Sequence, residues 1–266
     1  MSTSLTRLPY VEHGDPDGVP VVMLHGVTDS WRSFEPVLPH LPEYIRAIAV
    51  TQRGHGEAPK PESGYLIEDM ARDAVKLLDD LGIERAVVVG HSMGSWVTQR
   101  IAIDHPERLL GVVLAGSFTG AVARDPALAA ELRALGDVPD PITYRYALEW
   151  QESTIARPMD AGQMDVFVRE SLKMPARIWT AAFNGFAEID QREELADVTV
   201  PALLVWGERD AFIPRETQDE LLETLSDARL EVYEGVGHAV HWEQPLRFAR
   251  EVAAFSRYSA ALQLSR

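Results

Sequence analysis

The 266-residue sequence contains no cysteine, which excludes disulfide bonds, thiolate metal ligands and a cysteine nucleophile. It also lacks a run of 18 apolar residues that could span a membrane, and it has no cluster of lysine and arginine. The net charge of −16 opposes binding to nucleic acid or to an anionic membrane, so neither partner is expected. Residues 1–10 lack the apolar segment of a signal peptide, and a cytoplasmic location is therefore expected.

Short apolar segments of strand-like composition alternate along the chain with longer segments of helical periodicity. This order is typical of an α/β fold with a mostly parallel central sheet flanked by helices, which is the fold class we predict. The predicted strands are residues 21–24, 45–50, 86–89, 110–114, 202–206 and 230–233, with a weaker edge strand at residues 8–11. The predicted helices are residues 65–81, 92–104 and 245–258, with Gly82 as a left-handed C-cap of the first.

Residues 117–195 interrupt this alternation with helical patterns, several prolines and no convincing strand. We interpret them as a helical cap inserted into a core that consists of residues 1–116 and 196–266. The segment is rich in aromatic side chains, most of which are expected to form the core of the cap itself. A minority is expected to line a substrate pocket. The candidate pocket residues are Trp31, Phe118, Trp150, Trp179 and Phe183.

The motif GHSMG at residues 90–94 lies between a predicted strand and a predicted helix. In a GxSxG turn at such a position, the serine has a strained backbone, and the flanking glycines avoid Cβ clashes with neighbouring elements. Ser92 is therefore the candidate nucleophile. A serine hydroxyl is a poor nucleophile at neutral pH, so a base must take its proton and a third group must orient that base.

Three histidines follow Ser92 in the chain and are candidates for the base. His238 lies in a glycine-containing loop directly after the predicted strand at residues 230–233. Loops at the carboxyl ends of parallel strands collect reactive groups, so His238 is the candidate base. His105 is expected at a helix end. His241 is expected to pack with the last helix, and it is the alternative base.

The orienting acid is expected in the loop after the predicted strand at residues 202–206. This loop contains both Asp210 and Glu208, and Asp210 is the candidate, with Glu208 as the alternative. The loop after the predicted strand at residues 110–114 contains no carboxylate, and this absence favours Asp210.

An oxyanion that develops on the substrate needs two backbone N–H donors. Met93, the residue after the nucleophile, is expected to provide one of them. The second is expected from Val27, because Gly26 lets the first long loop turn close to the reacting carbon. His25, which precedes this turn, is expected to be a buried hydrogen-bonding residue.

Six short motifs, spread over essentially the whole chain, resemble those of the α/β-hydrolase superfamily, in the capped branch that includes bacterial carboxylesterases and lactonases. They are LHG at residues 24–26, RGHG at 53–56, GHSMG at 90–94, HPER at 105–108, WGERD at 206–210 and GVGH at 235–238. The resemblance implies an α/β-hydrolase fold with a Ser92, Asp210, His238 triad. Thr51 and Ala58 stand where the family often has aspartate and serine.

These observations predict a serine hydrolase that cleaves ester or lactone bonds of a small to medium, mostly apolar substrate through an acyl-enzyme. A C–C bond hydrolase of ring-cleavage products and a cofactor-free perhydrolase use the same three residue types and are the alternatives. A ligand-binding receptor of the same fold is the third alternative. No metal or organic cofactor is expected, because the chain has no HExxH, DxDxDG or GxGxxG motif. The oligomeric state is left open.

Overall fold

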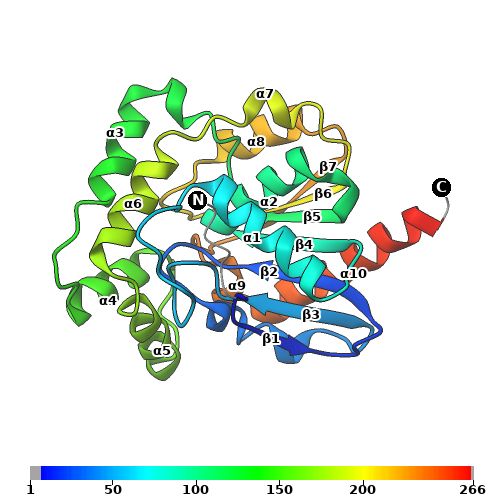
Figure 1. The fold of residues 1–266 in the computed structure, drawn as a ribbon, viewed down its shortest axis with the longest axis horizontal. Helices are drawn as coiled ribbons and strands as arrows, with labels where there is room; N and C mark the ends of the chain where they lie inside the picture. Colours follow the sequence, from blue (N-terminus) through cyan, green and yellow to red (C-terminus); the bar gives the residue numbers. More distant parts are fainter. Residues whose placement is uncertain (1–6, 265–266) are drawn as a thin grey trace.

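The computed structural model of the protein describes residues 7–264. Its seven strands form one sheet in the order β1-β3-β2-β4-β5-β6-β7 (Figure 1). All neighbouring strands are parallel except β1, which pairs antiparallel with β3 at one edge. The strands are β1 (Tyr10–His13), β2 (Val19–Leu24), β3 (Ile45–Val50), β4 (Ala86–His91), β5 (Leu109–Ala115), β6 (Ala202–Gly207) and β7 (Ala228–Tyr233).

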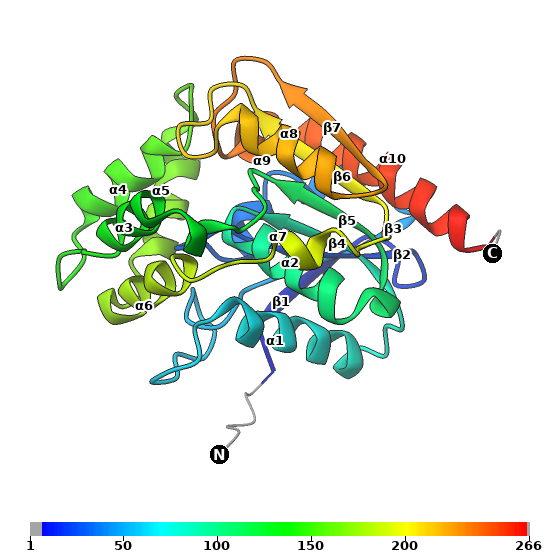
Figure 2. The same cartoon turned by 90° about the horizontal axis from the view of Figure 1, so that it is seen from above.

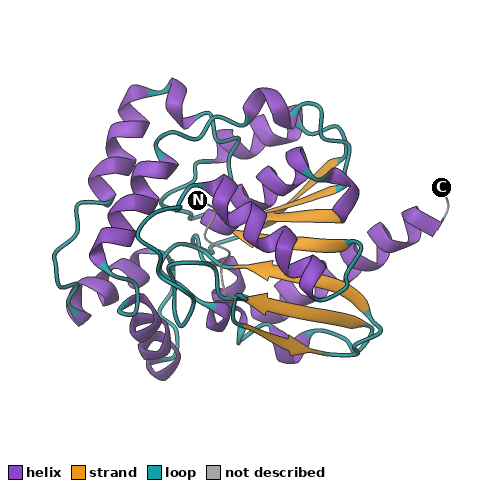
Figure 3. Cartoon of the chain, viewed as in Figure 1, coloured by secondary structure: helices purple, strands orange, loops and turns teal. Residues whose placement is uncertain are grey.

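Helices cover both faces of the sheet and also gather at one of its ends (Figure 3). The helices are α1 (Ile67–Asp80), α2 (Met93–Asp104), α3 (Pro126–Leu135), α4 (Tyr144–Ser153), α5 (Ala161–Ser171), α6 (Ala176–Phe186), α7 (Arg192–Leu195), α8 (Arg215–Thr224), α9 (Val240–Glu243) and α10 (Pro245–Leu264). Short 3-10 helices are η1 (Trp31–Phe34), η2 (Leu38–His40), η3 (Pro106–Arg108) and η4 (Val122–Arg124). The predicted mostly parallel α/β fold is therefore confirmed.

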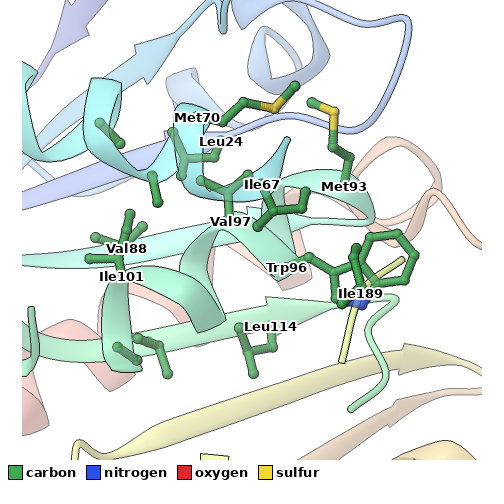
Figure 4. Close-up of a cluster of buried hydrophobic side chains, with 14 of the residues drawn as sticks. Leu24, Ile67, Met70, Val88, Met93, Trp96, Val97, Ile101, Leu114 and Ile189 are labelled. Atoms are coloured by element: carbon green, nitrogen blue, oxygen red, sulfur yellow. The ribbon is translucent and has the colours of Figure 1, made fainter. Parts of the chain in front are cut away.

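The two faces of the sheet have separate apolar cores, because successive residues of a strand point to opposite faces. On one face, Leu24 and Val88 pack with Val97 and Ile101 of α2, as Figure 4 shows. On the other face, the alternate strand residues pack with apolar side chains of α10. Burial on both faces explains why the strands are nearly continuous apolar runs in the sequence.

The predicted edge strand and the last helix differ from the structure at their ends. The edge strand is Tyr10–His13, two residues later at both ends than expected. Pro9 has no N–H to donate to a neighbouring strand, and its carbonyl accepts a hydrogen bond from Thr51 N at 2.8 Å. Helix α10 continues six residues beyond the predicted end. Ser259 is fully buried there, and a Cβ atom on Gly111 would lie 2.7 Å from its Oγ. A buried serine in place of an apolar residue hides the helical periodicity.

Helix α1 ends as the sequence predicts. Gly82 follows it with a φ of +65°, in the left-handed region that glycine adopts without strain. A Cβ atom at Gly82 would have nothing within 4 Å, so space does not restrict this position.

The segment between β5 and β6 contains α3 to α7 and, as far as the described residues extend, no strand. Helices α3 to α6 lie beyond the end of the sheet toward which the parallel strands run (Figures 1 and 2). Within this group α4 packs on α5, and α3 packs on α6. Helix α7 instead contacts α2, where Arg100 Nη1 lies 2.9 Å from Glu194 Oε2. The assignment of residues 117–195 to a cap stays a prediction.

Two expectations reach beyond the described residues. The expected absence of a signal peptide depends on residues 1–10, of which 1–6 lie outside the described part. The core boundaries at residues 1 and 266 lie outside it too. In the described part, none of the helices combines the length and the apolar character needed to cross a membrane.

Candidate active site

Ser92 occupies the turn between β4 and α2 with φ 50° and ψ −119°, a conformation that non-glycine residues rarely adopt. The turn is fixed on both sides by backbone hydrogen bonds. Ser92 N donates to Ala115 O of β5 at 2.9 Å, and Ser95 N donates to Ser92 O at 2.8 Å. The serine side chain is thus held at the carboxyl end of the sheet, on the wall of a cavity.

The glycines on either side of Ser92 are required by space. A Cβ atom on Gly90 would lie 2.1 Å from Gly94 O, and one on Gly94 would lie 2.1 Å from Leu24 O. Both contacts are with backbone atoms, which cannot turn aside as a side chain can. The start of α2 therefore approaches β4 and β2 as closely as the sequence motif predicts.

We expect Gly94→Ala to lower the free energy of unfolding by about 3 kcal/mol or more, because the new methyl group must displace the backbone of β2. Gly82→Ala is the matched control. It introduces backbone strain at a positive φ but meets no neighbouring atom, so a loss of only about 1–2 kcal/mol is expected. Urea unfolding of the two variants and the wild type measures both losses. Equal losses would mean that the turn can relax around a methyl group.

His238 and Asp210 form a buried pair. His238 Nδ1 lies 2.7 Å from Asp210 Oδ2, and the two side chains are 6% and 0% exposed. Asp210 Oδ1 accepts hydrogen bonds from the amides of Phe212 at 2.8 Å and Ile213 at 2.9 Å. An ionised carboxylate only accepts hydrogen bonds, so His238 Nδ1 carries the proton. The other ring nitrogen, Nε2, is then left without a proton.

The ring of His238 packs directly against the loop that follows β5. Gly116 has a φ of +56°, and a Cβ atom there would lie 2.8 Å from His238 Cε1. The backbone carbonyl of His238 accepts a hydrogen bond from His91 Nε2 at 3.1 Å. Ring and backbone are therefore fixed by separate contacts.

The loop that carries His238 is also bound to the segment after α4. Ala239 N donates to Thr154 O at 2.9 Å. Glu243 Oε1 accepts from Gly237 N at 2.7 Å and from Ala156 N at 3.0 Å. A Cβ atom on Gly237 would lie 2.6 Å from Ala156 N, so the two chain segments touch without an intervening side chain. Residues 154–156 thus help to set the position of His238.

The predicted oxyanion donors lie at the start of α2 and in the turn after β2. Both Val27 and Met93 are buried, and Val27 lines the cavity. A Cβ atom on Gly26 would lie 3.0 Å from His91 Nδ1, and Thr28 has a φ of +72°. Between residues 7 and 264, no protein acceptor is found for the amide N–H of Val27 or Met93. Their role as oxyanion donors remains a prediction.

Ser92 and His238 lie on the wall of one cavity with a volume of about 210 Å³. Its wall is mainly apolar and combines core residues with residues of α3, α4 and α6. Trp150 of α4 joins the two parts, with its ring centroid 5.6 Å from that of Phe183 and 5.8 Å from that of Phe212. Within the described residues, no group of three or more His, Asp or Glu side chains is placed to hold a metal ion.

Three of the five predicted pocket residues line this cavity: Phe118, Trp150 and Phe183. Trp179 lies elsewhere, which corrects the prediction. It is completely buried, its ring contacts that of Trp150 at a centroid distance of 5.3 Å, and its Nε1 donates to Leu135 O. Trp179 therefore supports the cavity wall from behind.

Trp31 also lies away from the cavity, which is the second correction to the predicted pocket. It is the first residue of η1 and packs against the apolar cluster on the α10 face of the sheet. The guanidinium carbon of Arg32 lies 4.7 Å from the centre of its ring. The sequence places Trp31 near the turn after β2, but the direction of η1 takes its side chain away from Ser92.

His25 and the two alternative residues, His241 and Glu208, each have partners of their own. His25 is fully buried, and both of its ring nitrogens are hydrogen bonded to backbone atoms, as expected. His241 Nε2 lies 2.9 Å from Ser33 Oγ, and burial lowers the pKa of His241 to about 3. Glu208 Oε2 accepts from the amide of Gly235 at 2.9 Å, while the carboxylate at His238 is that of Asp210.

Sequence reasoning missed a buried carboxyl group in the cavity wall, that of Asp29. Its Oδ1 accepts a hydrogen bond from Gln151 Nε2 at 3.0 Å, and its Oδ2 accepts one from Ser33 Oγ at 3.0 Å. Burial raises the pKa of Asp29 to about 7. A signal was present, because Asp29 is the one carboxylate in the stretch of residues 18–34.

Comparison with known proteins gives a family and several relatives. A family model described as alpha/beta hydrolase fold matches residues 19–245. The candidate carbamate hydrolase RutD of Variovorax paradoxus is 31% identical over 264 residues, 95% of this chain and 97% of that protein. A 2-hydroxy-6-oxononadienedioate/2-hydroxy-6-oxononatrienedioate hydrolase of Cupriavidus pinatubonensis is 26% identical and aligns over 88% of this chain and 86% of its own. Among solved structures, an esterase from Exiguobacterium antarcticum matches with a TM-score of 0.86 and 23% identity, covering 94% of this chain and 95% of its own.

Proposed function

We propose that this chain, which belongs to the alpha/beta hydrolase fold family, hydrolyses ester or lactone bonds with Ser92, His238 and Asp210 as a catalytic triad. The observation that carries the proposal is the buried His238–Asp210 pair on the same cavity as a serine with a strained backbone. The pair leaves one imidazole nitrogen free to take a proton, and the strained turn presents one hydroxyl group.

The mechanism is a two-step acyl transfer. His238 Nε2 takes the proton of Ser92 Oγ as this oxygen attacks the substrate carbonyl carbon, and the amides of Val27 and Met93 bind the oxyanion. The C–O bond to the leaving group breaks, and His238 returns the proton to that oxygen. Water then attacks the acyl carbon, with His238 again as the base. The bond from this carbon to Ser92 Oγ breaks, His238 returns the proton to Oγ, and the carboxylic acid leaves. Asp210 orients the imidazole through Nδ1 and stabilises its protonated form.

The cavity favours a small to medium, mostly apolar substrate. Its volume is about 210 Å³ and its wall is largely aromatic and aliphatic. We infer that residues 117–195 act as a cap, because side chains of α3, α4 and α6 complete the cavity over Ser92. A covered cavity suits soluble molecules better than lipid at an interface.

A C–C bond hydrolase is the second candidate, supported by the similarity to the Cupriavidus pinatubonensis enzyme. The name of that relative describes a dicarboxylate substrate. Among the described residues that line the cavity, there is no lysine or arginine to bind a carboxylate, and the net charge of the chain is −16. A neutral ester or lactone therefore fits better. A perhydrolase uses the same three residue types and stays a further alternative.

The test is proton release in a pH-stat with short aliphatic esters, aryl esters, lactones and carbamate esters. A fluorophosphonate probe is applied in parallel, and the labelled peptide is identified by mass spectrometry. We expect turnover of esters or lactones and a label on Ser92. No turnover, with Ser92 still labelled, would contradict the esterase proposal and favour a C–C hydrolase or a perhydrolase. A label elsewhere would contradict Ser92 as the nucleophile.

A further inference from the structure

Asp29 lies in the turn between β2 and η1 and is 5% exposed, on the wall of the cavity. Its two hydrogen-bond donors, Gln151 Nε2 and Ser33 Oγ, are neutral groups. As far as residues 7–264 show, no lysine or arginine forms an ion pair with it. An ionised carboxyl group has about four acceptor positions, so about two remain for a ligand.

The carboxyl group lies beside the turn that carries the proposed oxyanion donor. A Cβ atom on Gly26 would be 3.4 Å from Asp29 Oδ2. Gly26 directly precedes Val27, whose amide is the proposed oxyanion donor. A substrate group that reaches Asp29 is therefore joined to the reacting carbonyl through few bonds.

The carboxyl group of Asp29 lies in a cavity wall that is otherwise mainly apolar. Asp29 and Glu131 are the carboxylates among the described lining residues, and Glu131 is exposed to solvent. A wholly apolar ligand would displace water from Asp29 and leave its charge poorly compensated, which is unfavourable. A ligand with a hydrogen-bond donor next to Asp29 would replace the hydrogen bonds of the displaced water.

We propose that Asp29 determines substrate specificity by accepting a hydrogen bond from a donor group of the substrate, a hydroxyl, amide N–H or ammonium group near the scissile carbonyl. The inference rests on the proposed hydrolase function and adds the class of substrate. It also implies discrimination against substrates with a carboxylate at that position, since two negative charges would then face each other in a buried site.

The preference for substrates with a hydrogen-bond donor depends on pH, because it depends on the charge of Asp29. The titratable groups around this residue are His238, His91, Glu170 of α5 and, through Ser33, His241. Burial raises the pKa of Asp29 to about 7, and the negative charge of Glu170 adds to this rise. The hydrogen bonds from Gln151 and Ser33 and a positive charge on His238 lower the pKa in turn. Burial lowers the pKa of His91 and of His241, which are therefore neutral near pH 7. Above about pH 7, Asp29 is ionised and accepts hydrogen bonds more strongly.

The experiment compares substrates with and without a donor. Ethyl butyrate is the reference, and the donor substrates are ethyl 3-hydroxybutyrate, 2-hydroxyethyl butyrate and ethyl 3-aminobutyrate. Their kcat/KM values are measured for the wild type, Asp29→Asn and Glu152→Gln. The last is the matched control, because Glu152 is an exposed carboxylate on α4, next to Gln151 but outside this cavity. For at least one donor substrate, we expect its kcat/KM relative to that of ethyl butyrate to fall at least about tenfold in Asp29→Asn. The same ratio should stay unchanged in Glu152→Gln.

The wild type alone gives a second test if Asp29→Asn fails to fold. Because His238 acts on every substrate in the series, its protonation cancels in the ratio, and the ratio should rise between about pH 6 and pH 8. The ratio could instead be independent of pH and the same in the wild type and in Asp29→Asn, with every ester still hydrolysed. This result would overturn the inference about Asp29 but not the proposed hydrolase function. If none of the esters is hydrolysed, the proposed function itself fails, and this inference fails with it.

Discussion

Ser92→Ala is expected to lower kcat by roughly 10⁴- to 10⁶-fold on the best substrate of the pH-stat series. Removal of the hydroxyl group leaves no side chain to form the acyl-enzyme. The residual rate comes from the oxyanion donors and from the binding of substrate beside water. The fold should persist, because Ser92 is held by backbone hydrogen bonds to β5 and to the first turn of α2. Initial rates and labelling by the fluorophosphonate probe are both measured.

Ser95→Ala is the control for this substitution. Ser95 lies in the first turn of α2, and its Oγ donates to Ser92 O at 2.6 Å and contacts Ser117 Oγ at 2.7 Å. Its removal loosens the turn but leaves the nucleophile in place, so we expect a loss of less than about tenfold. If Ser92→Ala kept activity within tenfold of the wild type, Ser92 would not be the nucleophile.

Asp210→Asn is expected to lower kcat by about 10⁴-fold. The amides of Phe212 and Ile213 donate to Asp210 Oδ1, so the oxygen of an asparagine would keep that place. Its NH₂ group would then face His238 Nδ1 and make this nitrogen an acceptor. The proton of the neutral ring would move to Nε2, which could no longer accept one from Ser92. The variant should keep its fold, which circular dichroism checks beside the rate measurement.

Glu208→Gln is the matched control in the same loop. It removes one negative charge, but the amide oxygen can still accept the hydrogen bond from Gly235 N that Glu208 accepts at 2.9 Å. A rate within about tenfold of the wild type is expected. A larger loss in Glu208→Gln than in Asp210→Asn would reverse the assignment of the acid.

The sequence predicts those parts of the molecule that depend on short segments. The turn at Ser92 has its glycines, its preceding strand and its following helix within about twenty residues, so local pattern is enough to locate it. His238 and Asp210 each follow a buried strand, and the parallel order of the sheet brings such loops to one edge. Local sequence and sheet topology together account for their proximity.

The pocket could not be predicted in the same way, because it depends on how helices from distant parts of the chain pack. Trp150, Trp179 and Phe183 are all aromatic residues of the inserted helices, yet Trp179 lies behind the wall that the other two form. Asp29 is the one carboxylate of residues 18–34, but its place in the cavity wall could not be predicted for a similar reason. Its partner Gln151 is 122 residues away in the chain, and nothing in either segment indicates the contact.

The hydrogen bonds between residues 154–156 and the loop of His238 have a consequence for recombination between relatives. A chimaera that takes residues 117–195 from one parent and the remainder from another would combine Thr154 and Ala156 of the first with Gly237 and Glu243 of the second. The backbone contact at Gly237 leaves no room for a side chain at this position. We therefore expect such a chimaera to keep its activity only if residues 154–156 and 237–243 come from the same parent, although some eighty residues separate them.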